Sequence, residues 1–185
     1  MRKYLTICVL AFFVLGMTFH SNLAYAKTVK EIDAGVDAAL IRLKQQFPNT
    51  TDLLGRSKGV LIFPEVIKAG FGIGGEYGEG ALRIKGKTVD YYNTIGGSFG
   101  FQMGGQIKTI YLFFMEPLAL EEFRAASGWT GGLDASVAFV TLGKDGSIDT
   151  TKINKPIMAF VMDQKGLMYS LTLGLGKFNK IYKPY

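Results

Sequence analysis

Apolar side chains recur every three or four residues along segment 27–47, at Val29, Ile32, Val36, Leu40, Leu43 and Phe47. This spacing places them on one face of a helix and leaves polar side chains on the other. Thr28 and Glu31 have the spacing of a capping box, which satisfies exposed backbone donors at a helix start. Asp33 and Asp37 lie among the cations of the polar face and largely cancel its field. The pattern predicts an amphipathic helix that packs on the domain instead of seeking a membrane.

Beyond this helix, short apolar runs alternate with glycine-containing turns, which is typical of antiparallel strands. The predicted strands are 60–63, 69–77, 81–85, 89–95, 99–103, 108–114, 135–142, 157–162 and 167–175. Tight turns are predicted at 85–87, 143–146 and 163–166, where a glycine can adopt positive φ. Glu116 and Pro117 open a second predicted helix, which runs to Ala126. The elements predict an α+β fold: an N-terminal amphipathic helix plus a glycine-rich, strongly curved antiparallel sheet, closed like a barrel or nearly so, with one inserted helix.

The first residues have the order of a secretory signal peptide. Two cations precede an apolar run over 4–17, which is too short to span a bilayer comfortably. Ala24 and Ala26 place small side chains where a leader peptidase requires them, so we expect cleavage before Lys27. The alternative is an uncleaved membrane anchor.

Cleavage there would remove Cys8 and His20, the single cysteine and the single histidine of the chain. The exported protein would then lack a disulfide, a thiolate nucleophile, a Cys/His zinc site and a His-based triad. Cys8 lies inside the leader and not at its boundary, which argues against a lipoprotein. Ser98 and Ser136 lie in no Gly-x-Ser-x-Gly elbow, and the carboxylates have no metal-ligand spacing. We therefore expect no enzymatic activity, no cofactor and no metal.

Gly70 to Gly75 matches the G-x-G-x-x-G pattern of dinucleotide sites, and Asp90 lies about where the ribose-binding acid is expected. The context argues against such a site, because an expected strand follows the glycines where a helix is required. Glycines at alternate positions leave one face of that strand almost bare: Gly72, Gly74, Gly78 and Gly80. They favour strong curvature, or the close approach of another backbone or an acyl chain. We expect Glu76 and Glu79 to flank a turn, with solvated carboxylates.

The formal net charge is +6, and it falls by two when the leader and its two cations are removed. This mild excess fits an anionic membrane surface better than a nucleic acid, because the chain has no arginine-rich stripe. The last residues, 177–185, combine three lysines with three aromatic rings and no acid. They predict either a lipid-surface anchor or a short final strand with a frayed end.

Four segments carry a family resemblance: 57–64 with its continuation 68–71, 98–104, 133–138 and 165–173. Ser57-Lys58-Gly59-Val60-Leu61-Ile62-Phe63-Pro64 and the three later segments resemble, in order, those of the SYLF domain family. The resemblance implies lipid binding, with phosphoinositides as the ligand class of eukaryotic members and actin filaments as a second ligand of some. We accordingly divide the chain into a signal peptide and one SYLF-like domain: 1–26 and 27–185, the latter comprising helix 27–47, core 57–176 and tail 177–185.

Two departures limit what the resemblance transfers. Val140 to Gly143 stands where many relatives have a Gly-Pro-x-Gly turn, and Leu133 replaces an alanine. The tail from Lys177 onward lies beyond the similar region and inherits nothing. An exported protein does not meet cytoplasmic actin, so we expect the ligand class to persist as anionic lipid with a different headgroup.

The expected protein is a periplasmic or envelope-associated domain that binds anionic phospholipid through basic residues around the curved sheet. The candidate lipid-binding residues are Lys58, Lys68, Arg83, Lys85, Lys87, Lys177, Lys180 and Lys183. A turn at 85–87 would project its two lysines together with Arg83, so this hairpin is expected to contribute more than the helix 27–47. A second interpretation is a structural or assembly partner of cell-envelope proteins that binds through a sheet edge. Salt separates the two, because lipid capture weakens with ionic strength.

The exported protein is predicted to begin at Lys27, because Ala24 and Ala26 are the well-placed small pair behind the apolar run. The intact mass of the protein recovered outside the cytoplasm measures this directly. A mature species that retains residues 1–26 would show instead that the leader serves as an anchor.

Overall fold

The computed structural model describes residues 26–100, 106–130, 137–139, 155–163 and 176–184. The predicted leader, the predicted turn at 143–146 and the predicted strand 167–175 lie outside these residues. The predicted turn at 163–166 and the strands 99–103 and 135–142 are described only in part.

The amphipathic helix is α2, Val29–Gln46, and its predicted capping box is confirmed. Thr28 Oγ1 accepts the Glu31 N–H at 3.3 Å, while the Glu31 carboxylate accepts the Thr28 N–H at 2.7 Å. Ile32, Val36 and Leu43 on its apolar face are fully buried. Pro48 follows the last turn, and the chain then forms a second short helix, α3, Thr50–Arg56, that the hydrophobic pattern did not predict.

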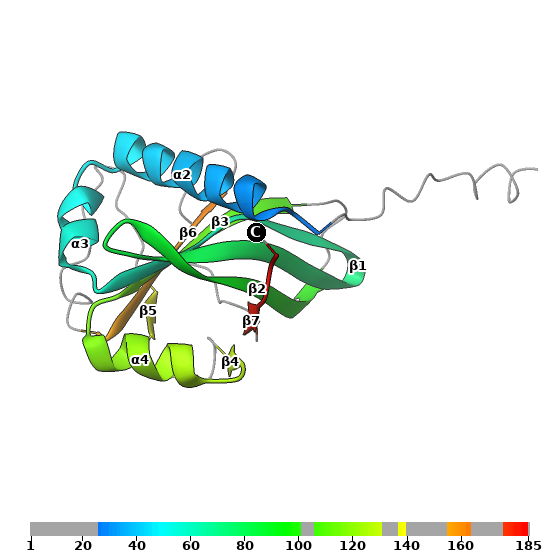
Figure 1. Ribbon diagram of the computed structural model, residues 1–185. Coiled ribbons are helices and arrows are strands. Elements are labelled where there is room, and N and C mark those ends of the chain that lie inside the picture. Colours follow the sequence, from blue (N-terminus) through cyan, green and yellow to red (C-terminus); the bar gives the residue numbers. More distant parts are fainter. Residues whose placement is uncertain (1–25, 101–105, 131–136, 140–154, 164–175, 185) are drawn as a thin grey trace, which may run out of the picture.

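The described strands form one seven-stranded sheet in the order β4-β7-β2-β1-β3-β6-β5. Neighbouring strands are antiparallel, except that β5 and β6 are parallel. Their bounds are β1 Gly59–Ile84, β2 Lys87–Gly100, β3 Gln106–Phe114, β4 Trp129–Thr130, β5 Val137–Phe139, β6 Ile157–Asp163 and β7 Lys177–Ile181. The α+β prediction with a strongly curved antiparallel sheet and one inserted helix is confirmed (Figure 1).

Strand β1 is long enough to have two partners, and its two halves lie against each other. Residues 59–68 pair with β3, whereas residues 72–84 pair with β2. A Cβ added at Gly78 would lie 2.8 Å from the Glu65 carbonyl oxygen, and one at Gly80 would overlap the Ile62 carbonyl. The alternating glycines therefore serve the close approach of another part of the backbone, which is one of the two uses that the pattern predicted.

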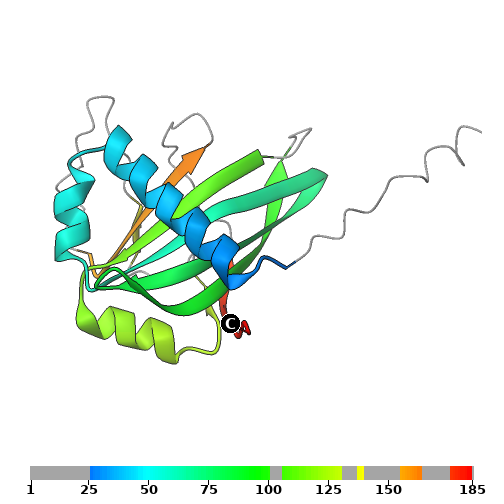
Figure 2. The same cartoon turned by 45° about the horizontal axis from the view of Figure 1, so that its top comes forward.

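Both faces of the sheet are covered by apolar packing (Figures 1 and 2). Helix α2 crosses the strands on one face, over a buried cluster that includes Val60, Ile62, Tyr91, Tyr111, Phe113 and Phe160. The opposite face carries the inserted helix α4, Pro117–Ala125, over a cluster that includes Leu61, Phe63, Tyr92, Leu112, Phe114 and Phe178. The helix begins as predicted, with Glu116 at its N-cap and Pro117 in its first turn.

Hydrogen bonds from strand β3 and from α2 itself help to join the helix to the sheet. The Tyr111 hydroxyl donates a hydrogen bond of 2.9 Å to the Ala39 carbonyl, and the Arg42 guanidinium donates one of 2.6 Å to Thr109 Oγ1. A Cβ at Gly35 would lie 3.0 Å from Pro64, so helix and strand pass close together there. These contacts hold the amphipathic helix on the domain, as its mixed polar face predicted.

The expectation of solvated carboxylates at Glu76 and Glu79 is wrong. Both residues lie inside β1, and both are buried, with 6% and 5% of their surface exposed. The sequence suggested a turn there because Gly75, Gly78 and Gly80 surround them, but Gly78 and Gly80 admit the other half of β1. Each buried carboxylate instead has a cationic partner, since an unpaired charge is costly to bury.

Glu76 forms a buried ion pair with Lys108 of β3. Lys108 Nζ donates to Glu76 Oε2 at 2.7 Å, and the two side chains are 9% and 4% exposed respectively. Removing one partner from such a pair leaves an uncompensated charge in a site with little water.

Lys108→Met is expected to lower the free energy of unfolding by about 3–5 kcal/mol, because it leaves Glu76 buried without its cation. Urea unfolding monitored by circular dichroism measures the loss. The double variant Glu76→Gln, Lys108→Met is the control and should recover much of the stability. A single variant as stable as the unmutated protein would contradict the structural role of the pair.

Candidate functional site

The fold gathers three of the candidate lysines at one end of the sheet. Lys58 precedes β1, and a Cβ at the adjacent Gly59 would lie 3.4 Å from the Arg83 carbonyl oxygen. Arg83 leads directly into the turn that holds Lys85 and Lys87, because Ile84 pairs with Lys87 across the hairpin. Lys58, Lys85 and Lys87 therefore share this end, and all three are exposed. We call them the lysine end of the sheet.

The turn at 85–87 has the geometry that its sequence predicted. Lys85 and Gly86 both have positive φ, 49° and 77°, as required by a tight hairpin whose twist matches its strands. A lysine at positive φ is less common than glycine there, and it places a cation at the tip of the turn. Lys85 thus lies beyond the last paired residues of the hairpin, and Lys87 is the first residue of β2.

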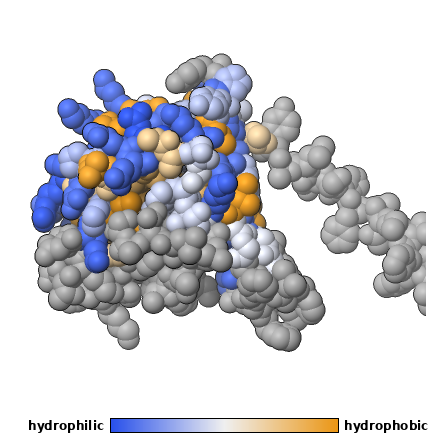
Figure 3. Space-filling view, turned by 90° about the horizontal axis from the view of Figure 1, so that it is seen from below, coloured by the Kyte–Doolittle hydropathy of each residue, from blue (hydrophilic) through white to orange (hydrophobic). Residues whose placement is uncertain are grey.

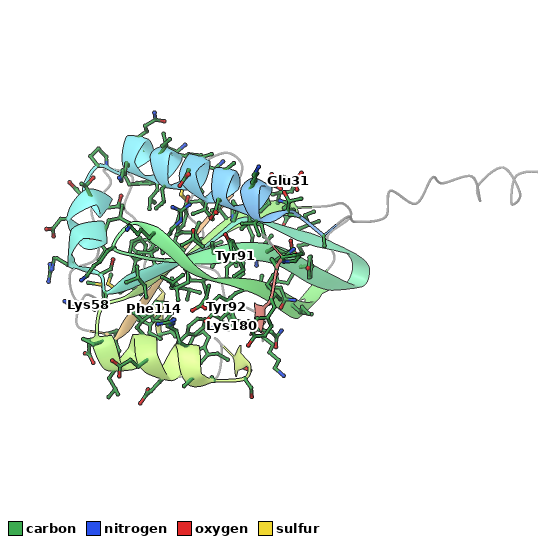
Figure 4. The ribbon with its side chains drawn as sticks, viewed as in Figure 1. Glu31, Lys58, Tyr91, Tyr92, Phe114 and Lys180 are labelled. Atoms are coloured by element: carbon green, nitrogen blue, oxygen red, sulfur yellow. The ribbon has the colours of Figure 1, made fainter. Side chains whose placement is uncertain are left out.

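A fourth lysine, on the segment just before β6, lies at the lysine end and was missed by sequence reasoning. The Lys58 N–H donates a hydrogen bond of 2.8 Å to the Phe114 carbonyl, and the Met115 N–H donates one of 2.8 Å to the Pro156 carbonyl. The exposed Lys155, next to Pro156, therefore lies at the same end as Lys58. The exposed Leu118 of α4 follows shortly after Met115 and adds an apolar side chain, 62% exposed. Lys58 and Phe114 lie beside each other in Figure 4, and Figure 3 shows hydrophilic side chains interspersed with hydrophobic ones over the described part of the visible face.

Within the described ranges, Lys58, Lys85, Lys87 and Lys155 form no ion pair with an acid. The acids on adjoining segments are Glu116 and Asp52, both exposed, and Asp52 pairs with Arg56 at 3.5 Å. The lysine end consequently presents several solvated positive charges, whose potentials add at the surface.

Arg83 does not belong to this group, which corrects the expectation that it projects with Lys85. Its guanidinium lies 3.3 Å from Asp33 and 2.9 Å from Asp37, both on α2. The Arg83 side chain is 16% exposed. Asp33 also accepts hydrogen bonds from Thr88 and Tyr91. The two acids that dilute the charge of the helix thus neutralise Arg83, which joins α2 to the sheet.

The remaining candidate lysines are dispersed. Lys68 lies at the far end of the β1–β3 pairing, opposite Gln106, and is partly exposed. Lys177 is exposed on β7. Lys180 forms an ion pair with Asp90, and Lys183 is held at 2.9 Å by Glu79. The fold does not bring these four side chains to the lysine end.

The C-terminal segment follows the second of its two predicted forms. Residues 177–181 are strand β7, paired with β2 and β4, and Phe178 is buried against Phe63 and Trp129. Tyr182 beyond the strand is 90% exposed. The segment is therefore an integral strand with a short exposed end.

The other motifs are accounted for by structure. The glycines of segment 70–75 lie in β1, so no helix follows them to receive a pyrophosphate. Asp90 binds Arg124 of α4 at 2.9 Å as well as Lys180, which occupies the carboxylate that a ribose would need. The described residues contain no group of three or more potential metal ligands. No helix in the described ranges is long and apolar enough to cross a membrane.

Residues 95–180 match a family model described as Ysc84, Las17-binding protein actin regulator. The match confirms the resemblance to the SYLF family over this part of the chain. The match includes the segments 98–104, 133–138 and 165–173 that carried the resemblance, whereas Ser57–Pro64 precedes it. No curated protein matches the chain.

The SYLF match runs from the end of β2 through β7, and so includes Lys177 and Lys180 of the tail, which the resemblance had excluded. Lys58, Lys85 and Lys87 lie before its first residue. The lysine end therefore lies before the matched residues, at the ends of β1 and β2, which pair with the matched strands β3 and β7.

Arg83→Gln is expected to lower the free energy of unfolding by about 1–3 kcal/mol, because Asp33 and Asp37 would lose their shared cation. Lys85→Gln, two residues later and solvated, is the matched control and should change it by less than about 0.5 kcal/mol. Urea unfolding of both variants makes the comparison. Equal stability of the two variants would mean that the Arg83 pairs contribute nothing.

Proposed function

We propose that this SYLF protein is an exported domain that binds anionic phospholipid at a membrane surface, and that the lysine end is the part that meets the headgroups. The observation that carries the proposal is the gathering of Lys58, Lys85 and Lys87 at one end of the sheet, exposed and without an acidic partner among the described residues. Lys108 and Lys183, which lie inside the sheet, pair with buried carboxylates, whereas these three lysines form no such pair with a described residue.

Lipid fits this surface better than actin, to which the family's description refers. The description names an actin regulator, and an exported domain would not meet cytoplasmic actin. Lysines at the tip of a turn are compact, hydrated charges that can approach many phosphate groups without a fixed geometry. The exposed Leu118 beside them would add apolar contact at the interface. No catalytic chemistry is part of the proposal.

Replacing Lys58, Lys85 and Lys87 together with glutamine is expected to weaken binding to vesicles of phosphatidylglycerol and phosphatidylcholine by roughly a hundredfold at moderate salt. The reason is that each basic residue near an anionic surface contributes about 1 kcal/mol. The matched control replaces Lys30, Lys44 and Lys177, three exposed lysines elsewhere, with glutamine. This control changes the net charge equally and should weaken binding much less. Vesicle co-sedimentation, at equal folded fraction by circular dichroism, measures both.

Three results would separate this proposal from its alternatives. Equal losses in the two triple variants would place the lipid contact elsewhere on the domain. Binding that is insensitive to salt would contradict an electrostatic site. An unmutated domain that ignores every anionic vesicle would favour the cell-envelope partner interpretation.

A further inference from the structure

The start of the described domain rests on a buried carboxylate. Glu79 of β1 has a side chain that is 5% exposed, and its Oε2 accepts the backbone N–H of Lys27 at 3.1 Å. Lys183 Nζ donates to both carboxylate oxygens at 2.9 Å, and the Tyr77 hydroxyl donates to Oε1 at 2.8 Å. Lys183 Nζ also donates a hydrogen bond of 2.7 Å to the Lys27 carbonyl. Both the N–H and the carbonyl of Lys27 are thus held beside Glu79.

The charges around Lys27 do not balance in the uncleaved chain. Three carboxylates lie around this residue, those of Glu31, Glu65 and Glu79. Two ammonium groups oppose them, because the Lys27 side chain pairs with Glu65 and Lys183 pairs with Glu79. Counted over the residues that the structure describes, the cluster therefore holds one more negative charge than positive charges. The pKa of Glu31 is lowered, mainly by the hydrogen bonds from Thr28 and also by the charges of Lys27 and Lys183. The Glu31 carboxylate therefore interacts with the same two ammonium groups as Glu65 and Glu79.

The peptide bond that would supply the missing charge is the one before Lys27. Ala26 is exposed, so a peptidase can reach the bond, and it is the bond that the small residues Ala24 and Ala26 predict to be cleaved. Hydrolysis breaks the bond between the Ala26 carbonyl carbon and the Lys27 nitrogen. Water adds its hydroxyl to the carbonyl carbon and one proton to the nitrogen, and the new carboxylic acid then loses its proton while the amine takes up a second one at neutral pH.

We propose that Glu79 is a binding site for the chain's own mature amino terminus, so that cleavage before Lys27 turns a neutral amide contact into an ammonium–carboxylate pair. The nitrogen already lies within hydrogen-bond distance of Glu79 Oε2, so the pair forms without a rearrangement. The new ammonium balances the three carboxylates. A charge-assisted hydrogen bond is stronger than the amide contact it replaces, and so processing stabilises the exported form. The inference depends on the predicted cleavage position and is independent of lipid binding.

The pairing makes the stability of the processed chain depend on pH. The groups facing the amine are Glu79 and Tyr77 of β1, Glu31 of α2, Glu65, the Lys27 side chain and Lys183. A paired ammonium has a pKa above its ordinary range of about 7.7–8.0. Its stabilisation is therefore complete below the unfolded value and is lost as pH rises through the folded value. Burial, together with the hydrogen bond to Glu79, raises the pKa of Tyr77 to about 12, so Tyr77 remains a neutral donor in this range.

Four proteins test the site: chains beginning at Lys27 or at Ala26, each with Glu79 and with Glu79→Gln. Keeping Ala26 moves the ammonium one residue away from Glu79. In the Glu79 background, this extension is expected to lower the melting temperature at pH 7 by about 3 °C. In the Glu79→Gln background it should have almost no effect. An equal effect in both backgrounds would overturn the proposal.

A second measurement needs no variant at Glu79 and remains decisive if Glu79→Gln does not fold. The rate at which an acylating reagent modifies the Lys27 α-amine, followed by mass spectrometry across pH, reports the pKa of that amine. We expect a value above about 8 in the folded chain and an ordinary value in urea. An ordinary value in the folded chain would overturn the proposal, as would an exported protein whose first residue is not Lys27. Loss of vesicle binding alone would bear on the lysine end and leave this site intact.

Discussion

The contact between the two halves of β1 is the constraint on which the rest of the structure depends. A side chain at Gly78 or Gly80 would collide with the backbone of residues 62–66. Because one half of β1 pairs with β2 and the other with β3, this close approach brings the two parts of the sheet together. The same approach brings Lys58 to the turn after Arg83 at one end, and places Glu79 beside the start of α2 at the other.

The cations on these strands are of two kinds, those buried within the sheet and those exposed at its turn. Within the sheet, water is scarce, so a cation needs a carboxylate, as in the pairs of Lys108 with Glu76 and Lys183 with Glu79. At the turn, water solvates the lysine, and it can remain without a partner. Arg83 lies on the boundary and is drawn to α2 by Asp33 and Asp37. Net charge alone therefore says little about which cations a ligand can reach.

Local signals could be predicted from the sequence, whereas contacts between distant segments could not. The start of α2 was visible because Thr28 and Glu31 satisfy each other's backbone within one turn. The turn at 85–87 was visible because glycine tolerates positive φ, and α4 because proline suits a first turn. Helix α3 escaped prediction because its seven residues are too few to show a period.

The residue type of the candidate site, lysine, could be predicted from the sequence. Which of the cations lie together could not. Lys58, Lys85 and Lys87 were candidates on charge alone, and their common location depends on Gly59 lying against Arg83. The role of Arg83 depends on Asp33, which is fifty positions away in the sequence. The glycines around Glu79 suggested a turn. Glycine spacing alone does not distinguish a turn from a strand that packs closely against another backbone segment.

The hydrogen bond from Lys183 to the Lys27 carbonyl has a topological consequence, because it makes the described domain almost circular. The two ends of the domain meet at one point, so a short linker would join them with little loss of chain entropy. New ends could then be opened in the exposed turn at Gly86, which would give a circularly permuted protein with the same core. A tag attached next to Lys27 or Lys183 would likewise leave the domain from that shared point, at the start of α2, where Figure 4 shows Glu31 far from Lys58.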